Sequence, residues 1–301
     1  MSTSPARSDD RPRENPREGD ASASDQARTE RLRRLAEEGA AELAAIEASG
    51  TPQEIAAAAS AWAARTFGDS LAVACSMADS VLPEVVARQA PGVDVLFLDT
   101  GYHFAETLET RDRVERELDV HIVDVRAKAS VPEQDAEHGP RLHDRDPGLC
   151  CAMRKVTPLR ETLAGYDAWI TGVRRDEGPT RADSPLVTFD DAFGLVKINP
   201  LVTWTLEEVN GYGYEHHLPM NPLLEQGFPS IGCAPCTRRV APGEDPRAGR
   251  WAGFEKTECG LHAGDDAEDD LADEGSRDEP ISVRNRITLT PVDHHRSGER
   301  R

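Results

Sequence analysis

The sequence has 301 residues, of which 38% are hydrophobic and 30% charged, and its net charge is −20. This composition is that of a soluble protein with enough apolar residues for one large α/β domain or two small ones. It excludes a membrane span, because no apolar run approaches the roughly 20 residues that a span needs. The acidic charge also argues against nucleic acid as a partner, because it repels phosphates.

The N-terminal part is predicted to hold a disordered tail and two helices. Residues 1–24 are polar and show no hydrophobic periodicity, so they resemble neither a signal peptide nor a folded element, and we expect a cytoplasmic protein. Residues 25–49 are rich in Ala, Glu, Leu and Arg, which is typical of an amphipathic helix. A second helix is predicted over residues 52–67, because Thr51 and Glu54 can form a capping box around Pro52 and Gly68 can end the helix.

Residues 68–217 alternate between apolar strands and helices. Strands are predicted at residues 71–76, 93–99, 121–125, 168–173, 185–189 and 195–198, and helices at residues 79–89, 103–118, 146–163 and 205–217. This alternation predicts an α/β fold whose parallel sheet is covered by helices on both faces. Ligands bind beyond the carboxyl ends of such strands, so the loops at residues 76–80 and 99–103 are candidates for a binding site.

Two segments follow this core. Residues 218–262 are rich in Pro, Gly and Cys and are predicted to form an ordered loop, and a loop of this length in a compact domain is usually functional. Residues 263–301 are predicted to form an acidic linker and a C-terminal extension, with acidic side chains concentrated between residues 264 and 279.

The sequence contains six cysteines, and four of them form two close pairs. The pairs are Cys150–Cys151, at the start of a predicted helix, and Cys233–Cys236. Four thiolates that converge on one point suit an iron–sulfur cluster or a zinc ion. Adjacent cysteines are awkward for one small ion, whereas a cluster offers each thiolate its own iron, so the spacing favours a cluster over zinc or a redox disulfide.

The remaining two cysteines have different surroundings. Cys259 lies in the polar stretch KTECGLHAG, where a lone cysteine beside Gly260 and His262 is a candidate nucleophile. Cys75 follows apolar residues of a predicted strand and is expected to be part of the core.

Together these motifs resemble those of bacterial adenylyl-sulfate reductases, within the wider phosphoadenylyl-sulfate reductase family. The resemblance covers roughly residues 70–262. Its blocks, in order, are LDTGYHFAET from Leu98, CCAMRKV from Cys150, TGVRR from Thr171, GLVKINP from Gly194, SIGCAPCT from Ser230, RWAG from Arg250 and ECGLH from Glu258.

The resemblance implies a fold, a cofactor and a reaction. The fold is the parallel-sheet, adenine nucleotide α-hydrolase-like domain, so residues 25–262 are expected to form one reductase domain with a nucleotide-binding core. The cofactor is a 4Fe–4S cluster on Cys150, Cys151, Cys233 and Cys236. The reaction is the thioredoxin-dependent reduction of adenosine 5′-phosphosulfate to sulfite and AMP, in sulfate assimilation and cysteine biosynthesis. The resemblance makes Cys259 the nucleophile and assigns Lys155, Arg247 and Arg250 to the phosphosulfate.

The predicted nucleotide loop departs from that of ATP pyrophosphatases. The stretch from Ser76 to Ser80 reads SMADS, and it lacks both glycines of the Ser-Gly-Gly-x-Asp-Ser loop. Glycine allows backbone N–H groups to approach a pyrophosphate closely, so the loop argues against ATP hydrolysis. The candidate substrate-binding residues of this region and its neighbours are Ser76, Asp79, Asp99, Thr100, Gly101, Arg174, Arg175, Arg181 and His262.

The expected chemistry is a two-step covalent exchange through an S-sulfocysteine on Cys259, with thioredoxin releasing sulfite. Three alternatives stay open. The same chemistry could act on 3′-phosphoadenosine 5′-phosphosulfate. An ATP-using tRNA thiolase of the same fold could carry a cluster, although the loop and the net charge of −20 count against it. A zinc-stabilised binding module would leave Cys259 inert.

Overall fold

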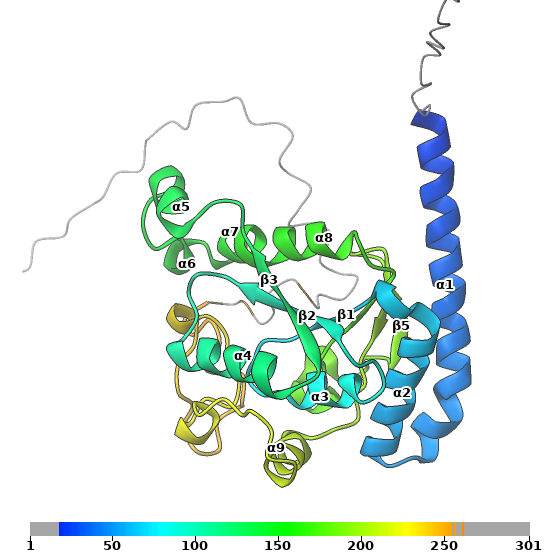
Figure 1. Ribbon diagram of the computed structural model, residues 1–301. Coiled ribbons are helices and arrows are strands. Elements are labelled where there is room, and N and C mark those ends of the chain that lie inside the picture. Colours follow the sequence, from blue (N-terminus) through cyan, green and yellow to red (C-terminus); the bar gives the residue numbers. More distant parts are fainter. Residues whose placement is uncertain (1–17, 255, 257–260, 262–301) are drawn as a thin grey trace, which may run out of the picture. The chain divides into compact units, whose positions relative to one another are not determined.

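The computed structural model describes residues 18–254, 256 and 261 (Figure 1). The chain divides into two compact units, Met1–Ala263 and Gly264–Arg301, and every described residue belongs to the first. None of the helices in this part of the chain is both long and apolar enough to cross a membrane.

The core of the described unit is a six-stranded sheet in the order β3-β2-β1-β4-β6-β5. The strands are β1 (Leu71–Ala74), β2 (Val93–Asp99), β3 (Val120–Arg126), β4 (Ala168–Ile170), β5 (Val187–Asp190) and β6 (Leu195–Ile198). All neighbouring strands pair in parallel except β5, which runs antiparallel to β6 at one edge. The prediction of a parallel sheet is therefore confirmed for five strands and wrong for β5, because a short link joins β5 and β6 as a hairpin.

Helices cover both faces of the sheet (Figure 1). The α-helices of the described residues are α1 (Glu18–Ser49), α2 (Pro52–Phe67), α3 (Val81–Ala87), α4 (Ala105–Glu117), α5 (Val131–His138), α6 (Leu142–Arg145), α7 (Pro147–Cys151), α8 (Thr157–Leu163) and α9 (Leu206–Glu215). Alternate residues of each strand supply the two faces. Val73 of β1 belongs to the same hydrophobic core as residues of α1, α2, α3 and α9, whereas Ala72 belongs to the core on the other face, with Leu159 and Leu163 of α8.

The N-terminal helices form largely as predicted. Around α2, the Thr51 hydroxyl accepts a hydrogen bond from the Glu54 N–H, the Glu54 carboxylate accepts one from the Thr51 N–H, and Gly68 ends the helix with a φ of 51°. Helix α1 begins at Glu18, inside the segment predicted to be disordered, so that prediction is wrong for residues 18–24. Residues 1–17 and 262–301 lie outside the described residues.

The region between β3 and β4 differs most from the prediction. The single helix predicted over residues 146–163 is α7 and α8 joined by a π-helical turn, η2 (Ala152–Val156). Helices α5 and α6 precede it and were not predicted, although Ser130 and Glu133 form a capping box at the start of α5. Turns of the π type are rare and are frequent at functional sites. This one carries Arg154 and Lys155.

Candidate functional site

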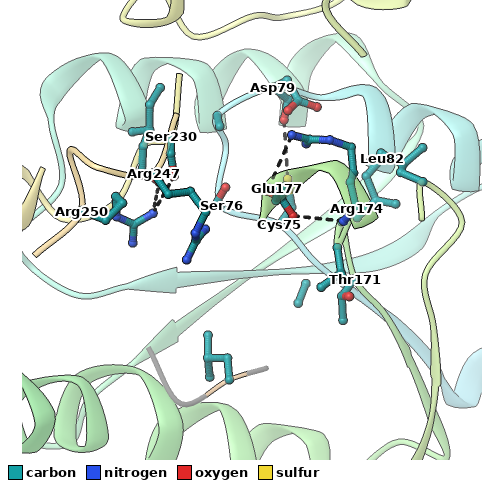
Figure 2. Close-up of a pocket in the computed structure, with 18 of the residues that line it drawn as sticks. Cys75, Ser76, Asp79, Leu82, Thr171, Arg174, Glu177, Ser230, Arg247 and Arg250 are labelled. Atoms are coloured by element: carbon teal, nitrogen blue, oxygen red, sulfur yellow. Dashed lines mark hydrogen bonds and ion pairs between the residues drawn. The ribbon is translucent and has the colours of Figure 1, made fainter. Parts of the chain in front are cut away.

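The main pocket lies at the carboxyl ends of β1, β2 and β4, as the sheet topology predicts (Figure 2). Strand β1 leads into Ser76 and Asp79, and β4 leads into Thr171 and Arg174. The loop that follows α9 closes the pocket with Ser230, Arg247 and Arg250, which Figure 2 shows together on one side, away from Asp79 and Arg174.

The loop after β1 contains a residue with a left-handed backbone conformation, although the loop has no glycine. Met77 has a φ of 57°, and its side chain is fully buried. Such a backbone costs a bulky residue about 1–3 kcal/mol, which the packing of the side chain must offset. Asp79 accepts a hydrogen bond from the Val81 N–H at 3.0 Å, at the start of α3. Burial raises the pKa of the Asp79 carboxyl, and the bond from Val81 and the charge of Arg174 oppose that shift.

The cationic side of the pocket holds the three residues assigned to the phosphosulfate: Lys155, Arg247 and Arg250. Arg250 Nη1 donates to the Ser230 hydroxyl at 3.2 Å and to the Ile231 carbonyl at 3.4 Å. Its guanidinium carbon lies 4.6 Å from the centre of the Trp251 ring. Its Nε is buried and, among the described residues, has no hydrogen-bond partner. A guanidinium held in one place at the edge of a pocket suits a bound anion.

A second set of arginines lies beside Asp79 and is largely neutralised by carboxylates. Arg174 Nε donates to Asp176 at 3.0 Å, its Nη2 lies 3.7 Å from Glu177, and Arg181 forms an ion pair with Glu177. Arg174, Glu177 and Arg181 all line the pocket. Arg175 does not line it. This residue donates to the Ser184 carbonyl at 2.9 Å and to Glu47 at 2.7 Å, and so ties the loop to α1.

The three predicted residues after β2 do not line the main pocket. Asp99 accepts from the Gly101 N–H at 3.1 Å and from Arg126 at 2.9 Å, and neither Asp99 nor Gly101 lines the main pocket. The Thr100 hydroxyl lies 3.3 Å from the Cys233 sulfur. Thr100 therefore belongs to the neighbouring pocket, which the cysteines form.

The four paired cysteines line this second, smaller pocket. Burial and the three neighbouring thiols raise the pKa of Cys150 to about 12. Burial, followed by Cys233 and Cys151, raises the pKa of Cys236 to about 11. Among the described residues, however, no group of three or more His, Cys, Asp or Glu side chains is arranged to hold a metal ion.

One wall separates the two pockets, since Lys155, Arg250 and Trp251 line both. Trp251 is buried with a φ of 46°, and its backbone N–H donates to the Cys236 carbonyl at 3.0 Å. Adding a Cβ atom to Gly232 would place it 2.4 Å from Arg250 Nη2, so the backbone there leaves room only for the guanidinium. A change in the cysteine pocket can therefore reach the cations of the main pocket through this wall.

Sequence reasoning gave no role to Arg154, Glu177 and Thr171, and it included His103 only as the last residue of the candidate loop at residues 99–103. Arg154 is buried, and it donates to the Thr100 carbonyl and, at 3.2 Å, to Ala129 and Gln134. Its place in the CCAMRK block was the one available signal, because its partners are distant in sequence. Cys75 is buried as predicted, and it also borders the main pocket. Burial raises the pKa of its thiol to about 12.

Two of the predicted residues, Cys259 and His262, lie outside the described residues. Leu261, between them in the sequence, is described and lines the main pocket.

A mostly parallel sheet with a partly cationic pocket at its carboxyl edge defines this protein as an α/β protein of the mostly parallel class. Residues 62–239 match the phosphoadenosine phosphosulfate reductase domain. The adenosine 5′-phosphosulfate reductase of Rhodococcus opacus is 55% identical over 77% of this chain and 95% of its own length. That of Streptomyces coelicolor is 56% identical over 78% and 96%. The crystal structure of the phosphoadenylyl-sulfate reductase from Candida auris matches with a TM-score of 0.55 at 27% identity, covering 66% of this chain and 96% of that one.

The chain belongs to the phosphoadenosine phosphosulfate reductase family.

Proposed function

We propose that this enzyme reduces adenosine 5′-phosphosulfate to sulfite and AMP in sulfate assimilation. The observation that carries the proposal is the meeting of Lys155, Arg247 and Arg250 in one pocket at the carboxyl edge of the sheet. The relatives that match most of the chain are named for this activity. The pocket offers a place for the two ends of such a substrate, because its cations suit the phosphosulfate and its apolar part suits a nucleoside.

In the first step the thiolate of Cys259 attacks the sulfur of the substrate. A bond forms between the two sulfur atoms, the bond from sulfur to the phosphate oxygen breaks, and AMP leaves with its electron pair. Two anions must approach one another in this step, so the role of Lys155, Arg247 and Arg250 is to neutralise the phosphosulfate and the charge that develops on AMP. Support for the placing of Cys259 comes from Leu261, two residues later, which lines the same pocket.

In the second step one thiolate of reduced thioredoxin attacks the sulfur of Cys259 and expels sulfite. A mixed disulfide forms, and the second thioredoxin thiol resolves it and frees Cys259. Two thiols are thereby oxidised to one disulfide, and the two electrons account for the reduction of sulfate to sulfite. This need for a thiol reductant agrees with a cytoplasmic location.

A 4Fe–4S cluster on Cys150, Cys151, Cys233 and Cys236 is part of the proposal. These residues suit a cluster because their four thiols line one pocket. A zinc ion would require the sulfurs to lie about 3.8 Å apart, since each Zn–S bond is about 2.3 Å, whereas a cluster accepts wider spacing. When bound, the cluster would order the segment that carries Lys155 and tune the charge beside the phosphosulfate, without donating electrons.

The test is anaerobic sulfite release with reduced thioredoxin, from adenosine 5′-phosphosulfate and from its 3′-phosphorylated form. We expect the first substrate to turn over, and Cys259→Ser to abolish sulfite release while AMP still binds. Iron and sulfide assays should give about four of each per chain.

Other outcomes would select the alternatives. Turnover of only the 3′-phosphorylated substrate would retain the chemistry and correct the substrate, in line with the similarity to the Candida auris structure. No sulfite from either substrate, in protein that holds iron and sulfide, would favour the ATP-using thiolase. Stoichiometric zinc with no effect of Cys259→Ser would favour the binding module.

A further inference from the structure

Asn221 lies in the loop that follows α9 and bonds to the loop after β1 at two points. Its side-chain Nδ2 donates to the Met77 carbonyl at 3.2 Å, and its backbone N–H donates to the Ala78 carbonyl at 3.2 Å. Asn221 is buried, and neither Asn221 nor Met77 lines the main pocket. The two bonds therefore join the two loops from outside the pocket lining.

The backbone at Met77 explains why the loop after β1 needs this support. A φ of 57° is unfavourable for a side chain of this size and persists only where the surroundings hold it. The buried Met77 side chain supplies one hold, and the Asn221 amide on the Met77 carbonyl supplies another. Ser76 and Asp79, on either side of Met77 in the sequence, line the main pocket (Figure 2). Their placement therefore depends on a backbone conformation that Asn221 stabilises.

The remaining hydrogen bonds of Asn221 fix the orientation of its amide. Its Oδ1 accepts from the Leu223 N–H at 3.1 Å, which forms a local turn, and its Nδ2 also donates to the Thr107 hydroxyl of α4 at 3.2 Å. The amide has two N–H groups, so one can serve Met77 and the other Thr107. Because the Met77 carbonyl can only accept and the Leu223 N–H can only donate, the two ends of the amide cannot be exchanged.

The loop that contains Asn221 also holds the cationic side of the pocket. Further along this loop, the Ser230 hydroxyl and the Ile231 carbonyl accept hydrogen bonds from Arg250. Asn221 therefore ties the loop after β1 to the segment that orients one of the three cations. A substrate that contacts both sides of the pocket must fit the distance that these bonds set.

We propose that Asn221 is a positioning residue, which holds Ser76 and Asp79 at a fixed distance from Arg250 so that one nucleotide can contact both sides of the pocket. The inference rests on the proposed nucleotide substrate. The reacting sulfur belongs with the cations, so contacts made by the loop after β1 should be equal in the ground state and the transition state. Their loss should raise KM and leave kcat unchanged.

The test is calorimetric binding of AMP and steady-state sulfite release, with the full chain purified anaerobically, in wild type, Asn221→Ser and Thr107→Val. Serine can retain the local turn, because its hydroxyl can accept from the Leu223 N–H, but it has no amide to reach the Met77 carbonyl. We expect Asn221→Ser to raise the Kd of AMP and the KM of the substrate about tenfold each, with kcat within about twofold of wild type.

Thr107→Val is the matched control, because it removes the other acceptor of the same amide and retains the bond to Met77. It should lower the temperature of thermal unfolding and leave the Kd of AMP within about twofold of wild type. Hydrogen exchange at residues 76–80 should be faster in Asn221→Ser than in Thr107→Val, because only the first variant releases the loop.

A measurement on wild type alone covers the case in which Asn221→Ser does not fold. AMP should slow hydrogen exchange at residues 76–80 and at residues 221–224 together, because the bonds of Asn221 join these segments. Protection of only one of the two segments would contradict the proposed role.

Three results with the variants would overturn the inference: a Kd of AMP in Asn221→Ser within twofold of wild type, an equal weakening of AMP in Thr107→Val, or a fall in kcat with KM unchanged. Failure of the proposed function is a separate result. A chain in which Asn221→Ser weakens AMP as expected but which releases no sulfite would contradict only the reductase assignment.

Discussion

Substituting Gly232 with alanine would displace Arg250 without removing its charge. The added Cβ would lie 2.4 Å from Nη2, 2.6 Å from Cζ and 2.9 Å from Nε of Arg250, far inside the 3.5–4.0 Å of ordinary contact. The guanidinium is the end of a flexible side chain, so it should move and leave the backbone intact. It would then lose its bonds to Ser230 and Ile231 and its position beside the phosphosulfate.

The size of the effect follows from one charge-assisted hydrogen bond to the substrate. Such a bond contributes about 1.5–3 kcal/mol, so kcat/KM for adenosine 5′-phosphosulfate should fall by a factor of about 10–150 in Gly232→Ala. The measurement is sulfite release at subsaturating substrate, with thermal unfolding in parallel. Gly211→Ala is the control, because a Cβ atom at Gly211 meets nothing within 4 Å and should leave kcat/KM unchanged.

A double-mutant cycle decides whether the effect acts through Arg250. In an Arg250→Ala background, Gly232→Ala should have almost no further effect on kcat/KM, because the atoms that it displaces are gone. The reasoning fails if Gly232→Ala retains wild-type kcat/KM, or if its effect is undiminished in the absence of the guanidinium.

Three further predictions concern single groups. Arg174→Gln should raise KM several-fold while Arg175→Gln should leave it unchanged, because only Arg174 of the two lines the main pocket. Equal changes of KM in the two variants, measured by steady-state kinetics, would contradict the prediction. Asp79→Asn should stabilise the protein at pH 7, because burial raises the pKa of the Asp79 carboxyl in the folded state. The folded state of the wild type therefore loses stability as the pH rises above the ordinary Asp pKa of about 3.9. The gain in unfolding free energy, measured by urea denaturation, should shrink near pH 4, and a gain independent of pH would refute the charge argument. Thr51→Ala should cost about 0.5–2 kcal/mol of unfolding free energy with kcat unchanged, because it removes only the cap of α2.

The elements that sequence reasoning predicted correctly are those fixed by nearby residues. The capping box of Thr51 and Glu54 and the apolar run of β2 lie within one short stretch each. The antiparallel direction of β5 depends on its pairing with β6, and the π turn η2 on the contacts of Arg154 with Thr100, Ala129 and Gln134. Neither leaves a periodic pattern in the sequence.

In the site, too, the features fixed by nearby residues were predicted and those that depend on distant contacts were not. The sheet topology predicted a pocket beyond β1, and Ser76 and Asp79 line it. It could not separate Arg174 from Arg175, which are adjacent in the sequence but have partners on different elements, Glu177 and Glu47. It also could not place Thr100 beside the cysteine pocket, because the approach of its side chain to Cys233 depends on a segment more than a hundred residues away.

The wall that the two pockets share leads to a prediction about coupling. Lys155, Arg250 and Trp251 line both pockets, so a nucleotide that orders these side chains should also stabilise the proposed cluster site. Coupling between two sites is reciprocal: if AMP raises the equilibrium affinity of the chain for iron, then loss of iron must weaken AMP binding by the same factor.

We expect AMP to raise the chelator concentration that removes half of the iron at equilibrium about fivefold in wild type, corresponding to a coupling of about 1 kcal/mol, and to have little effect in Lys155→Met. Absorbance in the visible region follows the iron, and calorimetry on the iron-free chain measures the reverse effect. Protection by AMP that persists in Lys155→Met, Arg250→Met and Trp251→Phe would show that the shared wall does not couple the pockets, and the cysteine pocket would then act only by stabilising the fold.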